Sequence, residues 1–152
     1  MITKLDHKSL QIARQILTVQ IPSYREESRL LQTDRIPRLY DSVNDILSCD
    51  ERFLGYFQRE RLIGFISFKK KEVNLVDIHR LVVDPAYFRQ GVAKSLLSSL
   101  FKKFPNSTFI VSTGKGNTPA QTLYENEGFI QTGVTQAAPN LWINHYKRIP
   151  ER

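Results

Sequence analysis

Residues 81–93 read LVVDPAYFRQGVA, and this stretch decides the fold of the chain. It closes a segment rich in β-branched and apolar residues, 73–83, which predicts a buried strand that stops at Asp84 and Pro85. The loop that follows is basic and contains Gly91, and it leads into a segment with helical spacing of apolar residues. Because unpaired backbone N–H groups and the positive end of the helix dipole converge at such a junction, the stretch predicts a phosphate-binding site.

This stretch resembles motif A of the GNAT superfamily of acyl-CoA-dependent N-acyltransferases. That motif has Gln or Arg, two variable residues, Gly, one variable residue, and then Gly or Ala. Gly91 and Ala93 match it, whereas Phe88 stands at the Gln or Arg position, so Arg89 is expected to supply the nearby positive charge. The resemblance implies that the backbone of Arg89, Gln90, Gly91, Val92, Ala93 and Lys94 cradles the coenzyme A pyrophosphate. The motif alone leaves an ordinary strand-to-helix turn as the alternative.

A second informative stretch, residues 117–129, reads NTPAQTLYENEGF. Thr118 is a favourable N-cap, Pro119 suits the first helical position, and Gly128 suits the residue that ends a helix. Strands are expected on both sides of this helix, over 108–112 and 129–132.

The stretch resembles the motif B region of the same superfamily. The resemblance implies that Asn117 contacts the cofactor and that Tyr124 lies near the coenzyme A sulfur. The structural alternatives are a cap or turn role for Asn117 and a core role for Tyr124. Because both motifs occur in the family's order and spacing, the functional interpretation is favoured for both residues.

The remaining segments extend this pattern. Apolar periodicity predicts a helix over 9–19 that breaks at 21–24, then a second helical stretch that begins at Ile36 and Pro37. Strands are expected over 2–5, 53–58, 62–69, 73–83 and 142–148. The resulting order, β-α-α-β-β-β-α-β-α-β-β, is that of the GNAT fold.

The resemblance therefore implies an α/β (α+β) fold. A central mixed, mostly antiparallel twisted sheet has helices on both faces, and a splayed strand pair binds acyl-CoA. In this fold Leu81, Val82 and Val83 form one wall of the gap, and their backbone pairs with the pantetheine amides. A plain core strand is the alternative for these three residues. At 152 residues the chain is expected to form one domain, 1–152, around one core.

Composition narrows the class of protein. No apolar run is long enough to span a bilayer, and residues 1–8 lack the apolar segment of a signal peptide. The single Cys49 fits a reducing compartment, so a cytoplasmic location is predicted. The His and Cys residues show no metal-ligand spacing, so no metal is expected. The net charge of +7 suggests nucleic acid as a partner. The charges are scattered along the chain, however, and Lys69–Lys71 are expected at a hairpin turn, so nucleic acid is not favoured as a partner.

The implied reaction is transfer of an acetyl group from acetyl-CoA, as co-substrate, to an amine by direct attack in a ternary complex. Tyr124 is the candidate general acid, because a phenol with a pKa near 10 protonates a thiolate near 8.5 at a cost of only ~2 kcal/mol. Asp77 and His79, which point the same way on one strand, are candidate bases. Bound water is the alternative base.

The acceptor class stays open among a small-molecule amine, a peptide N-terminus and a protein lysine, and so does a homodimer. Acceptor-lining residues are expected in 21–40, with Pro22, Tyr24, Arg25 and Tyr40 as candidates, and in 136–142. Two other functions are weighed against the enzyme. One is a non-catalytic acyl-CoA-binding module of the same fold. The other, less favoured, is a basic RNA- or ribosome-associated protein.

Overall fold

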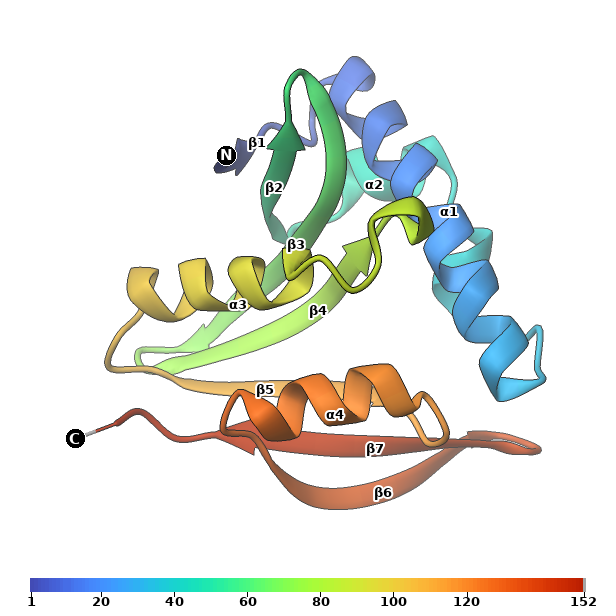
Figure 1. Ribbon diagram of the computed structural model, residues 1–152, viewed down its shortest axis with the longest axis vertical. Coiled ribbons are helices and arrows are strands. Elements are labelled where there is room, and N and C mark those ends of the chain that lie inside the picture. Colours follow the sequence, from blue (N-terminus) through green and yellow to red (C-terminus); the bar gives the residue numbers. More distant parts are fainter. Residues whose placement is uncertain (152) are drawn as a thin grey trace.

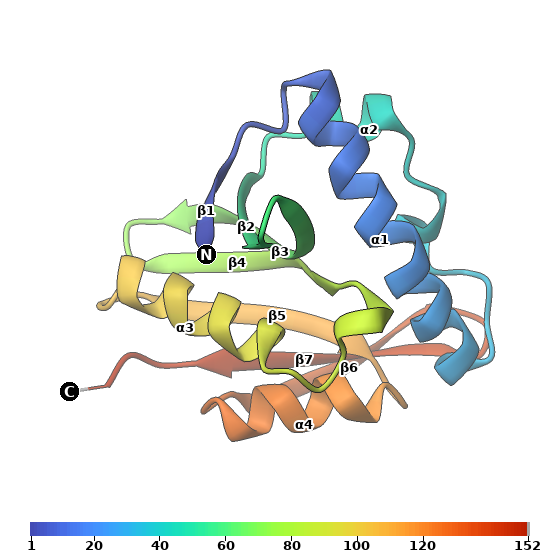
Figure 2. The same ribbon diagram turned by 45° about the horizontal axis from the view of Figure 1, so that its top comes forward.

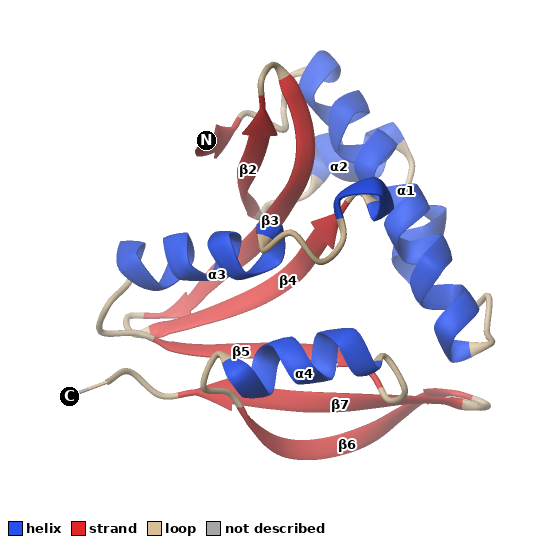
Figure 3. Ribbon diagram, in the orientation of Figure 1, coloured by secondary structure: helices blue, strands red, loops and turns tan. Residues whose placement is uncertain are grey.

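The computed structural model describes residues 1–151 of the chain. Within these residues a seven-stranded sheet, in the order β1-β2-β3-β4-β5-β7-β6, forms the centre of the molecule (Figures 1 and 3). The strands are β1 (Ile2–Leu5), β2 (Arg52–Gln58), β3 (Arg61–Glu72), β4 (Leu75–Val83), β5 (Thr108–Gly114), β6 (Ile130–Ala138) and β7 (Leu141–Arg148). The helices are α1 (Leu10–Leu31), α2 (Val43–Ser48), α3 (Val92–Lys103) and α4 (Thr118–Asn126), with 3-10 turns η1 (Pro37–Tyr40) and η2 (Pro85–Tyr87). The predicted element order and fold class are confirmed.

Helices cover both faces of the sheet. Figure 2 shows α1 and α2 on one face and α3 and α4 on the other. One core cluster joins the sheet to α3 and α4 around Leu96, Phe109 and Tyr146. The other joins it to α1 and α2 around Ile16 and Ile46. Burial of apolar area on both faces holds the layers together, at roughly 25 cal/mol per Å².

The parallel pair β4 and β5 separates soon after it forms. The two strands pair only at Leu75↔Thr108, Val76↔Phe109 and Asp77↔Ile110. Beyond these positions β4 stays paired to β3 as far as Val83, while β5 stays paired to β7 as far as Gly114. Figure 1 shows the two strands diverging toward their C-terminal ends. The predicted splay is therefore present, and it opens a gap in the middle of the sheet.

A β-bulge changes which way β4 presents its side chains. Ser67 pairs with Arg80 and Phe68 pairs with Ile78, which leaves His79 as the extra residue. Before the bulge, Ile78 packs in the core on the α3 and α4 side. After it, Val82 packs in the core on the α1 and α2 side. The two-residue alternation of side chains therefore holds from Asp77 to His79 and fails after His79.

Helix α1 is longer than predicted. The expected break at 21–24 was wrong, because the helix continues through Pro22 to Leu31. An internal proline removes one helical hydrogen bond, but packing on both sides of it keeps the helix intact. Ala13 and Ile16 are fully buried against the sheet, and Leu31 packs against Gly114 at the end of β5. Figure 1 shows α1 passing the C-terminal ends of β4 and β5.

The lysine run lies in a strand and not in a turn. Lys69–Lys71 belong to the end of β3, and the hairpin turn falls at Val73 and Asn74. Lys69 Nζ lies 2.9 Å from Asp50 Oδ2, and Lys71 Nζ lies 3.4 Å from Asp77 Oδ2. Two of the three lysines are thus paired with carboxylates of this chain.

Candidate functional site

A cleft of about 470 Å³ opens where β4 and β5 separate. Its walls come from the end of β4, the N-terminus of α3, the N-terminal turns of α4 and the second half of α1. Residues that line it include Tyr24, Glu27, Leu81, Val83, Arg89, Gly91, Val92, Ala93, Lys94, Asn117, Leu123 and Tyr124. The structure thus brings together the two sequence motifs, which lie more than twenty residues apart in the chain.

The loop before α3 presents a row of free backbone donors. Across the described residues, 1–151, the N–H groups of 89–94 have no hydrogen-bond acceptor, and the first helical bond runs from Ser95 N to Gly91 O at 3.0 Å. Arg89 and Gly91 have φ values of 64° and 78°, which turn the loop into the helix. A Cβ atom on Gly91 would meet open space, so nothing in the protein fills the volume beside these donors. This geometry suits a phosphate group.

Phe88 departs from the motif without disturbing this loop. Its side chain is 41% exposed, and its N–H donates to Pro85 O at 3.3 Å. The donor row begins one residue later. Arg89 and Lys94, both exposed, add positive charge beside the row. The substitution at the first motif position therefore leaves the backbone donors available.

The end of β4 has one free edge. Leu81, Val82 and Val83 pair with β3 on one side, and the register with β5 ends four residues before Leu81. Leu81 and Val83 line the cleft, whereas the Val82 side chain lies in the α1 and α2 core. An extended ligand with amide groups could pair with this edge as an added strand would.

Asn117, and not Thr118, caps helix α4. The Asn117 Oδ1 accepts a hydrogen bond from the Ala120 N–H at 3.3 Å, and its Nδ2 lies 3.4 Å from the Thr113 hydroxyl. The predicted cap was one residue late, because Asn and Thr are both good N-caps and spacing alone does not separate them. The cap hydrogen bond establishes a structural role for Asn117. Asn117 also lines the cleft, and its contact with the cofactor stays a prediction.

Tyr124 is both a core residue and a cleft residue. It is 5% exposed, and its ring lies 5.4 Å from the Phe129 ring and 5.7 Å from the Tyr146 ring. Burial raises the pKa of Tyr124 well above its ordinary value, and the nearby Tyr24 and Glu27 act in the same direction. The phenol is therefore neutral at physiological pH. It can donate a proton but is not available as a phenolate base.

Asp77 and His79 lie together on one face of β4, as predicted, but neither lines the cleft. His79 Nδ1 is 3.5 Å from Glu51 Oε2, and His79 Nε2 is 3.2 Å from Asp77 Oδ2. Hydrogen bonding to Asp77 and then to Glu51 raises the pKa of His79 to about 9, although burial opposes this. Burial would raise the pKa of Asp77, but His79 and Lys71 outweigh it and lower that pKa.

A protonated imidazolium and an ion-paired carboxylate are weak proton acceptors. The assignment of Asp77 or His79 as the base stays a prediction, and this electrostatic arrangement counts against it.

The same face holds a buried ion network under α1. Arg80 is 2% exposed; it contacts Glu51 and lies 3.1 Å from Asp41 Oδ2. Ser67 donates to Glu51 at 2.7 Å, and Gln20 donates to Asp41 at 2.7 Å. Although burial disfavours the charge, hydrogen bonds from His79 and Ser67 and the charge of Arg80 lower the pKa of Glu51 to about 2. This network joins α1 and the sheet to the segments that precede and follow α2.

The second half of α1 supplies cleft residues that the sequence only partly revealed. Tyr24 was expected to line the acceptor site and does line the cleft, whereas Pro22, Arg25 and Tyr40 do not. Glu27 was missed, because the break expected near Pro22 hid the helical spacing that places it one turn after Tyr24. The expected acceptor region at 136–142 forms the exposed end of the β6–β7 hairpin and does not line the cleft.

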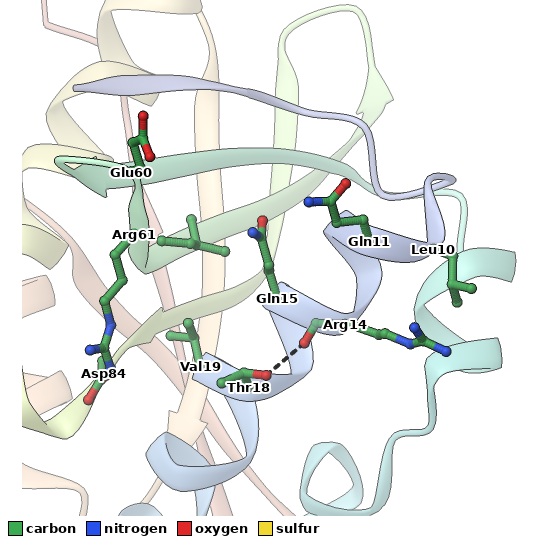
Figure 4. A pocket seen from close by; sticks show the side chains of 10 residues that line it. Leu10, Gln11, Arg14, Gln15, Thr18, Val19, Glu60, Arg61 and Asp84 are labelled. Carbon is green, nitrogen blue, oxygen red and sulfur yellow. Dashed lines mark hydrogen bonds and ion pairs between the residues drawn. The ribbon is translucent and has the colours of Figure 1, made fainter.

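A larger, more open groove of about 760 Å³ lies between the first half of α1 and the β2–β3 turn (Figure 4). An ion pair at its rim joins Arg61 Nη2 to Asp84 Oδ2 at 3.3 Å, and Thr18 donates to Arg14 O at 2.9 Å. No residue that the motifs assign to cofactor or catalysis lines this groove. The candidate site is therefore the cleft.

Two further features bear on the class of protein. Within residues 1–151 no group of three or more His, Cys, Asp or Glu side chains could hold a metal ion. Over the same described range, no helix combines the length and apolar character needed to cross a membrane.

Comparison with known proteins settles the family. The sequence model of the Acetyltransferase (GNAT) family matches residues 13–129, which include both motifs. The chain belongs to this family. The GNAT resemblance of the sequence is thereby confirmed.

Individual relatives are similar over different parts of the chain. UPF0157 protein YqkA of Bacillus subtilis is 40% identical over 153 residues, which cover 100% of this chain and 44% of that protein. A ribosomal protein bS18-alanine N-acetyltransferase of Haemophilus ducreyi is 33% identical over 84 residues, or 53% of this chain and 57% of that enzyme. This GNAT chain thus spans about half the length of the curated relatives it matches.

Solved structures share its fold. The PaiA N-acetyltransferase of Thermoplasma acidophilum, in complex with coenzyme A, has a TM-score of 0.73 and 22% identity over 98% of both chains.

Proposed function

We propose that this GNAT chain transfers an acetyl group from acetyl-CoA to the nitrogen of an amine by direct attack in a ternary complex. One observation carries the proposal. The splayed edge of β4, the free N–H groups of 89–94 and Tyr124 all face a single cleft. An ordinary strand-to-helix turn without a binding role would explain the loop, but it would not explain why the loop, the free strand edge and Tyr124 all face one cleft.

The residues present fit acetyl-CoA as the co-substrate. The N–H groups of 89–94 would hold the pyrophosphate, with Arg89 and Lys94 adding charge. The free edge at Leu81–Val83 would pair with the pantetheine amides. Both arrangements use backbone groups, so neither depends on the side chain at Phe88.

Tyr124 would act when the carbon–sulfur bond breaks. The amine nitrogen attacks the thioester carbonyl carbon, the carbon–nitrogen bond forms, and the sulfur leaves as a thiolate. Tyr124 donates its proton to that thiolate and recovers a proton from the nitrogen by way of water. Burial raises the pKa of the phenol, but it also raises the pKa of a thiolate formed in the same cleft. The transfer therefore does not become as unfavourable as the phenol's pKa alone would suggest.

Release of free thiol from acetyl-CoA tests the proposal. The acceptors are a primary alkylamine, a peptide with a free N-terminus, a lysine peptide with a blocked N-terminus and an aminoglycoside. We expect thiol release that depends on at least one amine, with one N-acetyl product for each thiol. Binding of acetyl-CoA without release above the hydrolysis rate would overturn the enzyme and favour a binding module. A protein that does not bind acetyl-CoA would overturn both.

A further inference from the structure

The cleft contains a carboxylate without a counter-charge. Glu27 lines the cleft from the second half of α1. Among residues 1–151 no Lys, Arg or His side chain forms an ion pair with it. Its neighbour Glu26, in contrast, is paired with Arg29 on the same helix. A carboxylate that is withdrawn from water without a cation is unfavourable, and in a chain of net charge +7 the absence of a partner is notable.

Helix α1 places this carboxylate near the junction of β5 and α4. One turn further along α1, Leu31 packs against Gly114 at the end of β5 and against Gly116 before α4. Glu27 and Asn117, the residue that caps α4, both line the cleft. Burial raises the pKa of Glu27, and the nearby polar groups of Asn117 and Gly114 offset part of that rise without supplying a positive charge.

Glu27 lies close enough to Tyr124 and Tyr24, the two phenols that line the cleft, for its charge to affect them. Its charge acts on Tyr124 and on Tyr24, and in both it raises the pKa. The charges of Arg80, Arg38 and Asp41, which belong to the ion network under α1, also act on the pKa of Tyr24. In that network each carboxylate, Asp41 and Glu51, has a cationic partner. Glu27 is the acidic group of the cleft that is left to receive a cation.

We propose that Glu27 binds the ammonium group of the acceptor and takes one of its protons before attack. The inference rests on the proposed function, and it names Glu27 as the base in place of Asp77 or His79. The ammonium gives one proton to the Glu27 carboxylate and becomes a neutral amine, which attacks the thioester carbonyl. The carbon–sulfur bond breaks, Tyr124 protonates the thiolate, and the second proton of the nitrogen returns to the Tyr124 phenolate by way of water. Glu27 then releases its proton to water, so the net reaction yields an amide, a thiol and one proton.

The same group sets the acceptor class. A carboxylate next to the reacting nitrogen repels an acceptor that carries its own carboxylate beside the amine. The acceptor is therefore an alkylammonium group without a neighbouring carboxylate. Free α-amino acids should be poor acceptors relative to the corresponding α-amino amides.

Glu27→Gln tests this role, with Glu125→Gln on the exposed face of α4 as the matched control. The glutamine retains the size of the side chain and its hydrogen-bonding capacity, so it removes mainly charge and basicity. We expect kcat/KM for the best amine to fall by ~10²–10⁴-fold in Glu27→Gln and to lose its rise with pH. Glu125→Gln should match the wild type. Acetyl-CoA affinity, measured by calorimetry, should be the same in all three proteins.

A second readout does not depend on turnover. NMR titration of each coenzyme A complex with n-butylammonium should show binding at least 10-fold weaker in Glu27→Gln than in wild type and Glu125→Gln. Wild-type turnover with a Glu27→Gln rate within threefold of it would overturn the assignment of Glu27 and leave the enzyme intact. A wild type without turnover that loses amine binding on Glu27→Gln substitution would overturn the enzyme and retain the amine site. Equal n-butylammonium affinity in all three proteins would overturn the amine site.

Discussion

Burial raises the pKa of both Tyr124 and Glu27 in the cleft, and the consequence differs because one is a phenol and the other a carboxylate. Tyr124 starts near 10, so a higher pKa keeps it protonated and suited to donate. Glu27 starts near 4.5, so a higher pKa makes its carboxylate a better proton acceptor near neutrality. His79 lies outside the cleft between the carboxylates of Asp77 and Glu51. These carboxylates raise the pKa of His79 to about 9, so the imidazole is a cation near neutrality. Environment, more than residue type, therefore separates the candidate acid from the candidate bases.

Tyr124→Phe separates the hydroxyl from the ring. Because the ring contacts with Phe129 and Tyr146 are kept, we expect acetyl-CoA affinity and thermal stability close to those of the wild type. Loss of the proton donor should lower kcat by ~10²–10⁴-fold if chemistry limits turnover. Steady-state kinetics and a thermal melt of the same sample test this. A folded variant with near-normal kcat would remove Tyr124 as the acid.

His79→Gln should destabilise the protein in a pH-dependent way. The folded-state pKa of about 9 lies above the ordinary value near 6.5, so protonation of His79 favours the folded state. This stabilisation is complete below about pH 6.5 and is lost as pH rises through about 9. We expect the variant to lose up to about 3 kcal/mol of unfolding free energy at pH 6 and much less at pH 10. Urea unfolding at both values measures the difference, and an equal loss at both would contradict the ion-network account.

Helix α1 shows where local sequence rules give way to packing. Pro22, Ser23 and Tyr24 predict a break, yet the helix runs on because it packs on both sides of Pro22. Ile16 is buried before it, and Leu31 packs against Gly114 after it. That continuation carries Tyr24 and Glu27 into the cleft. The loop at 89–94 is the opposite case, because glycine, a preceding strand and a following helix predict its free donors from local chemistry alone. Elements fixed by local rules were therefore predictable, and those fixed by distant contacts were not.

Pro22→Ala should stabilise α1. The alanine restores a helical N–H donor and removes a steric clash, and Pro22 is exposed, so no packing is lost. We expect a gain of roughly 1–3 kcal/mol in the free energy of unfolding, reduced by the greater freedom of the unfolded chain. Chemical denaturation measures it, with Pro105→Ala, beyond the end of α3, as the control. A loss of stability would mean that α1 needs its proline.

At the scale of the whole molecule, the order of the elements and the two motifs predict a gap between two parallel strands, and the structure contains it. The sequence does not reveal the bulge at His79, because a bulge depends on the register with β3. It also does not reveal that Asp77 and His79 do not line the cleft. Strand periodicity correctly places them on one face, but it does not show that this face meets Glu51, which lies far before them in the sequence.

The central claim is that acetyl-CoA binds in this gap with its pyrophosphate on the N–H groups of 89–94. Calorimetric titration of acetyl-CoA into wild type and Gly91→Val tests it most directly. Gly133→Val is the matched control, since a Cβ atom at either glycine meets nothing within 4 Å. Gly91 has a positive φ, so circular dichroism must first show that the variant is folded. We expect at least 10-fold weaker binding in folded Gly91→Val and unchanged binding in Gly133→Val. Equal affinity in all three proteins would contradict it.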